Sequence, residues 1–363
     1  MFTESSHPRI FVGTYTEPEQ STSEGIYVYR MDPSSGELTF ETVVQNIIDP
    51  SYLAVHPHTG YVYSVNEKGT FEGRPGGGVT ALAVEHPSGD IRRLNAQSSG
   101  GEDPCYISIE RTGRHALVAN YSSGSVAMLP IGSDGKLGPA SQVIRHTGSS
   151  VQPERQDGPY AHCILPDPTN RFAVACDLGI DKIMIYRMDL DARKLHGHAE
   201  VSVAPGSGPR HLTFHPNGQY AYVICELNST LLAFRYDSRA GMFEEIQSVR
   251  TVPPGYEGRN MCADLHVTPD GKFLYASNRG HDSLACFAVD AASGRLIPQG
   301  QTSSGGAEPR GFEIDPGGKF LLSANQNSDN IVTFLIDPET GQLTRIGDEM
   351  QVSMPVCIKY ANV

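Results

Sequence analysis

Arginine, glutamate and histidine side chains occur at matching positions of a segment that repeats along the chain. Its clearest copy, residues 208–226, contains Arg210 near the start and Glu226 at the end. Alternating apolar residues predict two strands, and Pro216-Asn217-Gly218 predicts the tight turn between them. A hairpin places the end of its second strand beside the start of its first, so we expect Arg210 and Glu226 to lie close together.

The other copies carry further charged and imidazole groups at the same two places. The residues aligned with Glu226, at the end of the second strand, are Thr14, Glu67, Tyr121, Asp177, Arg279 and Gln326. Those aligned with Arg210 are Ser51, Cys105, Tyr160, Ala263, Arg310 and Val356, with His162, His211, Asp264 and His266 nearby. A carboxylate or an imidazole can act as a general base, and arginines can stabilise an oxyanion or bind an anionic substituent. This pattern predicts a site for a small anion.

Each of these residues also has a purely structural interpretation. Arg210 and Glu226 could form a salt bridge that only stabilises neighbouring strands, and the sequence supports both interpretations equally. His162, beside an expected channel strand, is more typical of a structural histidine. Asp264 and His266 alternate onto one side of a strand and could be metal ligands, but without a third ligand the sequence predicts no metal site.

The repeated segments predict how these residues are positioned. Seven copies, 46 to 55 residues apart, begin at Pro50, Pro104, Pro159, Pro209, Cys262, Pro309 and Pro355. Each continues with a third strand, an Asp- and Gly-rich turn and a fourth strand, which predicts an all-β, seven-bladed β-propeller of four-stranded antiparallel blades. The last copy has only one strand, so residues 10–15 and 25–29 are expected to complete its blade. A blade built from both termini closes the ring and protects two sheet edges.

Loop lengths predict which face of the propeller carries the site. If the first strand of each blade lines a central channel, the loops after the second and fourth strands share one face, which we call the top face. The long loops 68–78, 146–158 and 251–261 fall on this face, whereas the turns on the opposite face are short and nearly uniform. Binding residues concentrate on long, ordered loops, so we expect the site on the top face.

Composition limits the class of protein. The 363 residues carry a formal net charge of −13 and no basic stripe, which argues against a nucleic-acid partner. No stretch approaches a membrane span, and residues 1–7 lack the apolar run of a signal peptide. The seven cysteines show no Cys-x-x-Cys spacing and favour reduced core residues in a cytoplasmic protein. The repeats leave no room for a second domain, so residues 1–363 are expected to form one propeller domain.

Five motifs occur together along the chain. They are Gly208-Pro209-Arg210-His211, Cys225-Glu226, Ser277-Asn278-Arg279-Gly280, Pro309-Arg310-Gly311-Phe312 and residues 148–162. As a set, and over essentially the whole chain, they resemble the seven-bladed propeller lactonase family, which includes 6-phosphogluconolactonases and fungal carboxy-cis,cis-muconate cyclases. The resemblance implies active-site roles for His162, Arg210, Glu226 and Arg279. The chain departs from the family pattern at two positions, with Tyr160 in place of a histidine and Cys225 in place of an asparagine.

These features favour a lactone hydrolase that resembles 6-phosphogluconolactonase, acts in carbohydrate metabolism and requires no metal or organic cofactor. Glu226 is expected to act as the general base on water if its pKa suits that role, with His162 as the alternative base or as the proton donor. Arg210 and Arg279 are expected to bind the carbonyl oxyanion or an anionic group. The expected substrate-binding residues are Arg155, Tyr160, His211, Glu67, Asp177, His266 and Arg310.

Two other functions fit the same residues. A muconate-type cyclase would use the cationic pocket while protonating a carbon instead of activating water. A non-enzymatic propeller would present its top face to a protein, a function that favours exposed aromatic residues, yet the chain contains no Trp. The expected partner is therefore a small anionic lactone, and the sequence predicts no particular oligomeric state.

Overall fold

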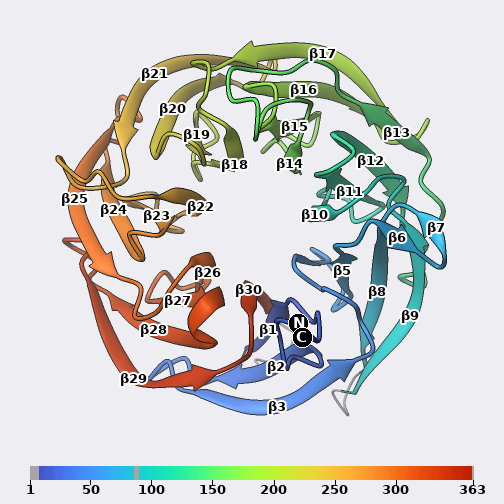
Figure 1. The fold of residues 1–363 in the computed structure, drawn as a ribbon, viewed down its shortest axis with the longest axis horizontal. Coiled ribbons are helices and arrows are strands. Elements are labelled where there is room, and N and C mark those ends of the chain that lie inside the picture. The colour runs from blue at the N-terminus through green and yellow to red at the C-terminus, as the bar shows by residue number, and fades with distance from the viewer. Residues whose placement is uncertain (1–7, 86–89, 362–363) are drawn as a thin grey trace.

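Seven four-stranded antiparallel sheets form a ring in the computed structural model, which describes residues 8–85 and 90–361 (Figure 1). Each sheet is one blade; in six blades the first strand lies nearest the central axis and the fourth at the outer edge, and in the blade that joins the chain ends the strand nearest the axis is the last one of the chain (Figure 1). The predicted all-β architecture of seven four-stranded blades is confirmed.

The blades are numbered from the N-terminus. Blade 1 contains β1 (Arg9–Thr14), β2 (Gly25–Met31), β3 (Leu38–Gln45) and β30 (Pro355–Ala361). Blade 2 contains β4 (Leu53–Val55), β5 (Val62–Asn66), β8 (Gly78–Val84) and β9 (Ile91–Ser98). Blade 3 contains β10 (Pro104–Ile109), β11 (His115–Asn120), β12 (Ser125–Pro130) and β13 (Gln142–Arg145). Blade 4 contains β14 (Ala161–Pro166), β15 (Phe172–Asp177), β16 (Lys182–Asp189) and β17 (Lys194–Ser202).

The remaining blades follow the same order. Blade 5 contains β18 (Pro209–Phe214), β19 (Tyr220–Cys225), β20 (Thr230–Asp237) and β21 (Met242–Arg250). Blade 6 contains β22 (Met261–Val267), β23 (Phe273–Arg279), β24 (Ser283–Val289) and β25 (Leu296–Ser303). Blade 7 contains β26 (Pro309–Ile314), β27 (Phe320–Asn325), β28 (Asn330–Ile336) and β29 (Leu343–Gln351).

Blade 1 joins the two ends of the chain, as predicted. β1 lies between β2 and β30 and pairs antiparallel with both strands. Its pairing with β30 runs from Arg9 opposite Ala361 to Thr14 opposite Pro355. The last strand of the chain thus completes the blade that the first strands begin. The edges that β1 and β30 present to each other are paired and therefore not exposed.

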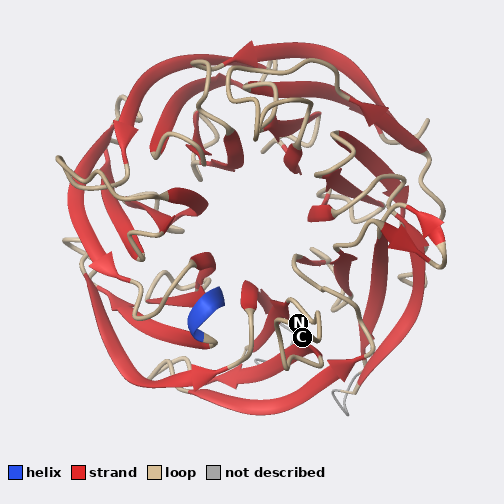
Figure 2. Cartoon of the chain, viewed as in Figure 1, coloured by secondary structure: helices blue, strands red, loops and turns tan. Residues whose placement is uncertain are grey.

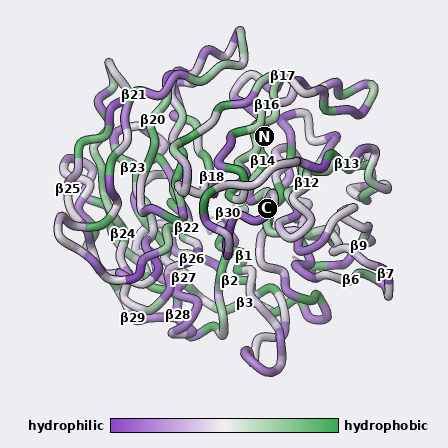
Figure 3. Tube along the Cα trace, turned by 45° about the horizontal axis from the view of Figure 1, so that its top comes forward, coloured by the Kyte–Doolittle hydropathy of each residue, from purple (hydrophilic) through white to green (hydrophobic). Residues whose placement is uncertain are grey.

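The hydrophobic core is divided among the interfaces between neighbouring blades. One cluster packs Leu117 and Met128 of blade 3 against Ile164 and Ala173 of blade 4. The second strands are buried throughout, as in β11 and β15, because each blade is covered on both faces. Figure 3 shows hydrophobic residues along the strands and hydrophilic residues in many of the connecting loops. The packed ring is therefore a firm support for the loops at its ends.

Short connections follow the predicted turn chemistry. Gly218 closes the β18–β19 hairpin with a φ of +70°, a conformation that glycine adopts readily, and its N–H donates to the carbonyl of His215. The long loop after β5 contains a small extra hairpin, β6 (Thr70–Phe71) with β7 (Arg74–Pro75). The helical segment drawn in Figure 2 is a single 3-10 turn, η1 (Gln326–Ser328). Within residues 8–85 and 90–361, no helix has the length and hydropathy of a membrane span.

Candidate active site

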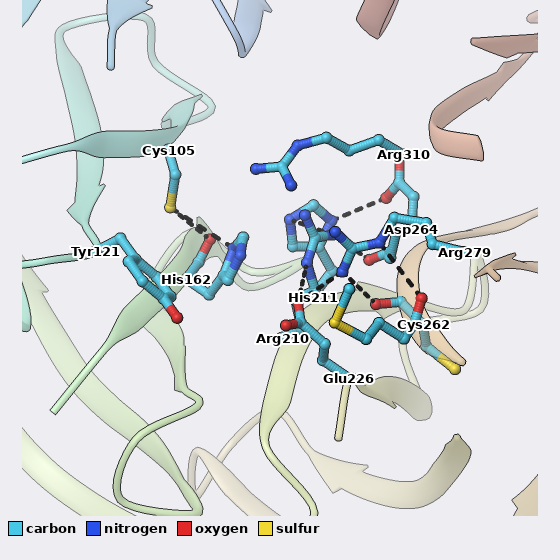
Figure 4. Close-up of polar contacts among 12 residues, drawn as sticks. Cys105, Tyr121, His162, Arg210, His211, Glu226, Cys262, Asp264, Arg279 and Arg310 are labelled. Carbon is cyan, nitrogen blue, oxygen red and sulfur yellow. Dashed lines mark hydrogen bonds and ion pairs between the residues drawn. The ribbon is translucent and has the colours of Figure 1, made fainter. Parts of the chain in front are cut away.

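A β-bulge in the first strand of four blades sets the direction of one side chain in each. In β10, β14, β18 and β26 the pairing register shifts by one residue and leaves Cys105, His162, Arg210 and Arg310 without a partner on the second strand. Bulges redirect side chains and are frequent beside active sites. The four side chains come from different blades and gather in one place (Figure 4). The bulges therefore supply half of the candidate site.

The register of blade 4 corrects the alignment expected from the sequence. β14 pairs Ala161 with Asp177 and leaves His162 at the bulge, so His162 rather than Tyr160 is the counterpart of Arg210. Tyr160 precedes the strand, and its ring stacks on a neighbouring tyrosine with the centroids 4.8 Å apart. The alignment of the repeats counted from Pro159, whereas the residue equivalent to Pro209 of blade 5 is Ala161, so the predicted position was wrong by two residues.

Residues that follow the second strands supply the other half of the site. The backbone N–H of Glu226 donates to the carbonyl of the residue before β18, and the equivalent bond in blade 4 is made by Leu178. Asp177, expected at this position, is therefore one residue too early. The same bond in blade 1 is made by Tyr15 rather than by Thr14. Asp177 and Thr14 therefore do not occupy the position equivalent to Glu226.

Asp177 is a structural residue rather than part of a cavity. Its carboxylate is fully buried, lies 2.6 Å from Nδ1 of His146 and accepts the backbone N–H groups of Tyr160 and Gly179. These bonds attach the start and the end of the loop 146–158 to the second strand of blade 4. The expected substrate-binding residue thus acts by holding the loop in place.

A small cavity of about 260 Å³ lies between the two sets of residues. It is lined by Glu67, Cys105, Tyr121, Arg155, His162, Glu226, Arg259, Met261, Arg279 and Arg310. Six of the eleven predicted site residues are among these, whereas Tyr160, Asp177, Arg210, His211 and His266 are not. Arg259 and Met261 were not among the predicted residues: the long loop 251–261 was expected on the face that carries the site, but the repeats gave no position for Arg259 within it or for Met261, which begins β22. The volume and the polar lining suit a small molecule.

Glu226 is buried between three arginines. Its Oε1 accepts from Nη2 of Arg155 at 2.5 Å, and its Oε2 accepts from Nη2 of Arg279 at 2.8 Å. Nε of Arg210 lies 3.0 Å from Oε2, which makes an ion pair without a hydrogen bond. Burial alone would raise the pKa of Glu226, but the charges of Arg279, Arg210 and Arg155 outweigh it and lower the pKa to about 2. The predicted proximity of Arg210 and Glu226 is confirmed, and Glu226 is ionised at neutral pH.

His162 presents a neutral imidazole to the cavity. Burial, reinforced by the charge of Arg210, holds its pKa well below the usual value. Its Nδ1 lies 3.6 Å from Sγ of Cys105, and the edge of its ring meets the ring of Tyr121 at a centroid distance of 5.3 Å. Burial also raises the pKa of the Cys105 thiol well above its usual value, so the sulfur stays protonated. Within the described residues, Nε2 of His162 makes no hydrogen bond.

Arg310 reaches into the same cavity from blade 7 (Figure 4). Its nearest carboxylate is that of Glu67, with Nη2 4.0 Å from Oε1, and its guanidinium lies 5.4 Å from the ring centre of Tyr15. Glu67 in turn accepts hydrogen bonds from Ser51 and Tyr15. Across the described part of the chain, the Arg310 guanidinium donates no hydrogen bond. Its N–H groups are therefore available to a ligand.

Beneath the cavity, buried polar groups form a chain along the first strands. Nη1 of Arg210 lies 3.3 Å from Nε2 of His211, whose Nδ1 lies 2.9 Å from Oδ1 of Asp264 (Figure 4). Oδ2 of Asp264 is 3.2 Å from Nε2 of His266, and Nδ1 of His266 is 3.5 Å from Oε1 of Glu313. Asp264 and His266, which could have been metal ligands, thus form a hydrogen bond with each other. Over the ranges that the structure describes, no group of three or more His, Cys, Asp or Glu side chains is arranged to hold a metal ion.

The chain of contacts fixes the tautomer of His211. An arginine can only donate, so Nε2 of His211 accepts from Arg210 and Nδ1 carries the proton toward Asp264. Burial and the charge of Arg210 lower the pKa of His211 to about 4, which agrees with a neutral ring. His211 therefore contacts Arg210 from behind the cavity and is not among the residues that line it.

Comparison with known proteins identifies the family. Residues 9–360 match the family described as Lactonase, 7-bladed beta-propeller. The chain belongs to this lactonase family. It is 38% identical to the 6-phosphogluconolactonase of Bacillus subtilis strain 168, over 97% of this chain and 98% of the relative. It is 35% identical to a 6-phosphogluconolactonase of Formosa agariphila, over 84% of this chain and 86% of the relative.

Solved structures give the same family. The periplasmic gluconolactonase of Pseudomonas aeruginosa superimposes with a TM-score of 0.91 and is 37% identical, covering 98% of this chain and 99% of that chain. Membership of the family makes the protein an enzyme of the lactone hydrolase class, as the sequence motifs implied. The names of these relatives differ in whether the lactone carries a phosphate group. One of them is described as periplasmic, so the cytoplasmic location of this chain stays a prediction.

Proposed function

We propose that this protein hydrolyses a phosphorylated sugar lactone of the 6-phosphogluconolactone type. The observation that carries the proposal is a neutral imidazole, His162, in the same cavity as Arg310, whose guanidinium donates no hydrogen bond to any described residue. The lining contains four arginines and two glutamates, an excess of positive charge in a chain whose net charge is −13. Such a focus of positive charge favours capture of an anionic substrate.

The reaction needs one base and one oxyanion donor. Nε2 of His162 takes a proton from water as the water oxygen bonds to the lactone carbonyl carbon. The charge that develops on the carbonyl oxygen is stabilised by the N–H groups of Arg310. Collapse of the tetrahedral intermediate breaks the bond between the carbonyl carbon and the ring oxygen, and protonated His162 returns its proton to the leaving alkoxide. The product is the open-chain hydroxy acid.

Glu226 is better suited to hold arginines than to accept a proton. With a pKa of about 2 it is a weak base at neutral pH, and each of its oxygens already faces a guanidinium. We therefore assign the role of base to His162, and we assign to Glu226 the positioning of Arg155, Arg210 and Arg279. This reverses the expected roles of the glutamate and the histidine.

The experiment that tests this function is hydrolysis of 6-phosphogluconolactone and of unphosphorylated gluconolactone, followed as acid release above the spontaneous rate in the same buffer. We expect turnover of both, with a higher kcat/KM for the phosphorylated compound. Absence of turnover on both lactones would reject the proposal and leave the cyclase as the function to test.

A further inference from the structure

Two arginines from different loops meet on one sulfur atom at the edge of the cavity. Nη1 of Arg155, from the loop 146–158, lies 3.6 Å from Sδ of Met261. Nη2 of Arg259, from the loop 251–261, lies 3.8 Å from the same sulfur. A thioether is a weak acceptor with no charge, so it does not neutralise either guanidinium. The two cations are close enough for one phosphate group to contact both.

Arg259 is the less neutralised member of the pair. Within residues 8–85 and 90–361 its guanidinium forms no ion pair, and its side chain is exposed at the mouth of the cavity. Arg155 is partly neutralised, because its Nη2 donates to Glu226. The two guanidiniums share only one carboxylate partner, Glu226, so an anion bound between them would interact favourably with both.

The loop that carries Arg259 is held in a defined conformation. The Tyr256 hydroxyl donates to the carbonyl of Arg259 at 3.1 Å, and the Tyr256 ring meets the ring of His281 edge-on with centroids 4.7 Å apart. The amide of Asn260 donates to the side-chain oxygen of Asn278 at 3.1 Å. These contacts attach both sides of Arg259 to blade 6, so its guanidinium is presented from an ordered loop.

The deeper arginines are less suited to a phosphate. Arg279 uses Nη2 on Glu226 and on the carbonyl of Cys262, and Arg210 uses Nη1 on the carbonyl of Ala263. The carboxylate of Glu226, held between them, would also repel a phosphate dianion. Apart from Arg310, which is assigned to the carbonyl group, the lining arginine without a carboxylate partner among the described residues is Arg259, at the mouth of the cavity.

We propose that Arg155 and Arg259 form a subsite for the phosphate of a phosphorylated sugar lactone, while His162 and Arg310 act at the carbonyl group. The proposal rests on the proposed function and adds the feature that selects a phosphorylated substrate over the plain lactone. Arginine suits this role because its planar fork donates two parallel hydrogen bonds to phosphate oxygens.

The test compares Arg259→Gln with wild type on 6-phosphogluconolactone and on gluconolactone. Loss of one charged hydrogen-bonding partner should lower the ratio of the two kcat/KM values by about 10- to 100-fold, mainly through a higher KM for the phosphorylated lactone. Arg235→Gln is the matched control, since it removes one positive charge from an exposed pair with Glu244 on β20. We expect the control to leave the ratio unchanged.

The outcomes separate the subsite from the reaction. Equal kcat/KM values of the wild type for the two lactones, or equal effects of the two variants on the ratio, would overturn the subsite while the hydrolase function stands. If the wild type hydrolyses neither lactone, the proposed function fails and calorimetric binding of 6-phosphogluconate decides the subsite. Binding to the wild type that Arg259→Gln weakens would then support it, and absence of binding would overturn it.

Discussion

Replacement of Glu226 by glutamine removes the one negative charge among three arginines and keeps the side-chain shape. In the wild type, the arginines lower the pKa of this carboxyl from 4.5 to about 2, against the opposing effect of burial. Because one pKa unit corresponds to about 1.4 kcal/mol, the ionised carboxylate stabilises the folded state by about 3 kcal/mol at neutral pH. We expect Glu226→Gln to lower the free energy of unfolding by about this amount, since it leaves buried positive charges without their partner.

The sign of the pH dependence follows from the lowered folded-state pKa. The stabilisation is fully present above pH 4.5, the ordinary pKa of the unfolded chain, and is lost as the pH falls from 4.5 toward 2. The difference in unfolding free energy between wild type and Glu226→Gln should therefore shrink from about 3 kcal/mol at pH 7 to about 1 kcal/mol at pH 3.

Urea unfolding at the two pH values, followed by far-UV circular dichroism, measures this difference. The slope of the unfolding free energy against urea should be the same for both proteins. Glu244→Gln is the matched control, because it breaks a single exposed ion pair with Arg235 and should change stability little. A Glu226→Gln protein as stable as the wild type at pH 7, or a difference that persists unchanged at pH 3, would refute the electrostatic role of Glu226.

Two further variants test the other parts of the site. Arg310→Gln should lower kcat/KM for the lactone by about 10²- to 10³-fold while the protein stays folded. Wild-type activity in this variant would exclude Arg310 as the oxyanion donor. His211→Gln should weaken the pH dependence of stability between pH 6.5 and 4, measured by urea unfolding. Burial lowers the pKa of His211 to about 4, so in this range the unfolded chain binds the proton and the folded wild type loses stability as the pH falls. The same pH dependence in variant and wild type would contradict this assignment.

The blades could be predicted from the sequence because strand, turn and repeat signals agree along the chain. The closure of blade 1 followed from counting strands at the two ends, and the pairing of β1 with β30 confirms it. Arg210 and Glu226 could be placed together because a hairpin fixes which strand ends meet. These inferences use backbone pattern alone, which repeats from blade to blade.

The site was less predictable because it depends on single-residue shifts and on unrepeated loops. A bulge places His162 where Tyr160 was expected, and the end of the second strand places Leu178 where Asp177 was expected. An error of one or two residues changes which side chain faces the cavity, and the sequence carries no direct signal for it. Arg259 lies in a loop without a counterpart in the other blades, so no alignment of repeats could indicate it.

The role of Glu226 shows a different limit. The residue type and its place beside Arg210 were correctly predicted, yet its suitability as a base depends on how many cations surround it. Arg155 and Arg279 approach it from other parts of the chain and bring its pKa to about 2. Charge environments of this kind are set by tertiary contacts, which spacing along the chain does not reveal.

The most direct test of the proposed catalysis is the pH dependence of kcat/KM for lactone hydrolysis in the wild type and in His162→Gln. We predict that wild-type kcat/KM is level at neutral pH and falls in acid as the imidazole is protonated, because the pKa of His162 lies well below its usual value. His162→Gln should lose about 10²- to 10⁴-fold in kcat and lose the acid limb of the profile, with its unfolding curve showing a folded protein. If His162→Gln hydrolyses the lactone at the wild-type rate and keeps the acid limb of the profile, the assignment of His162 as the general base is contradicted.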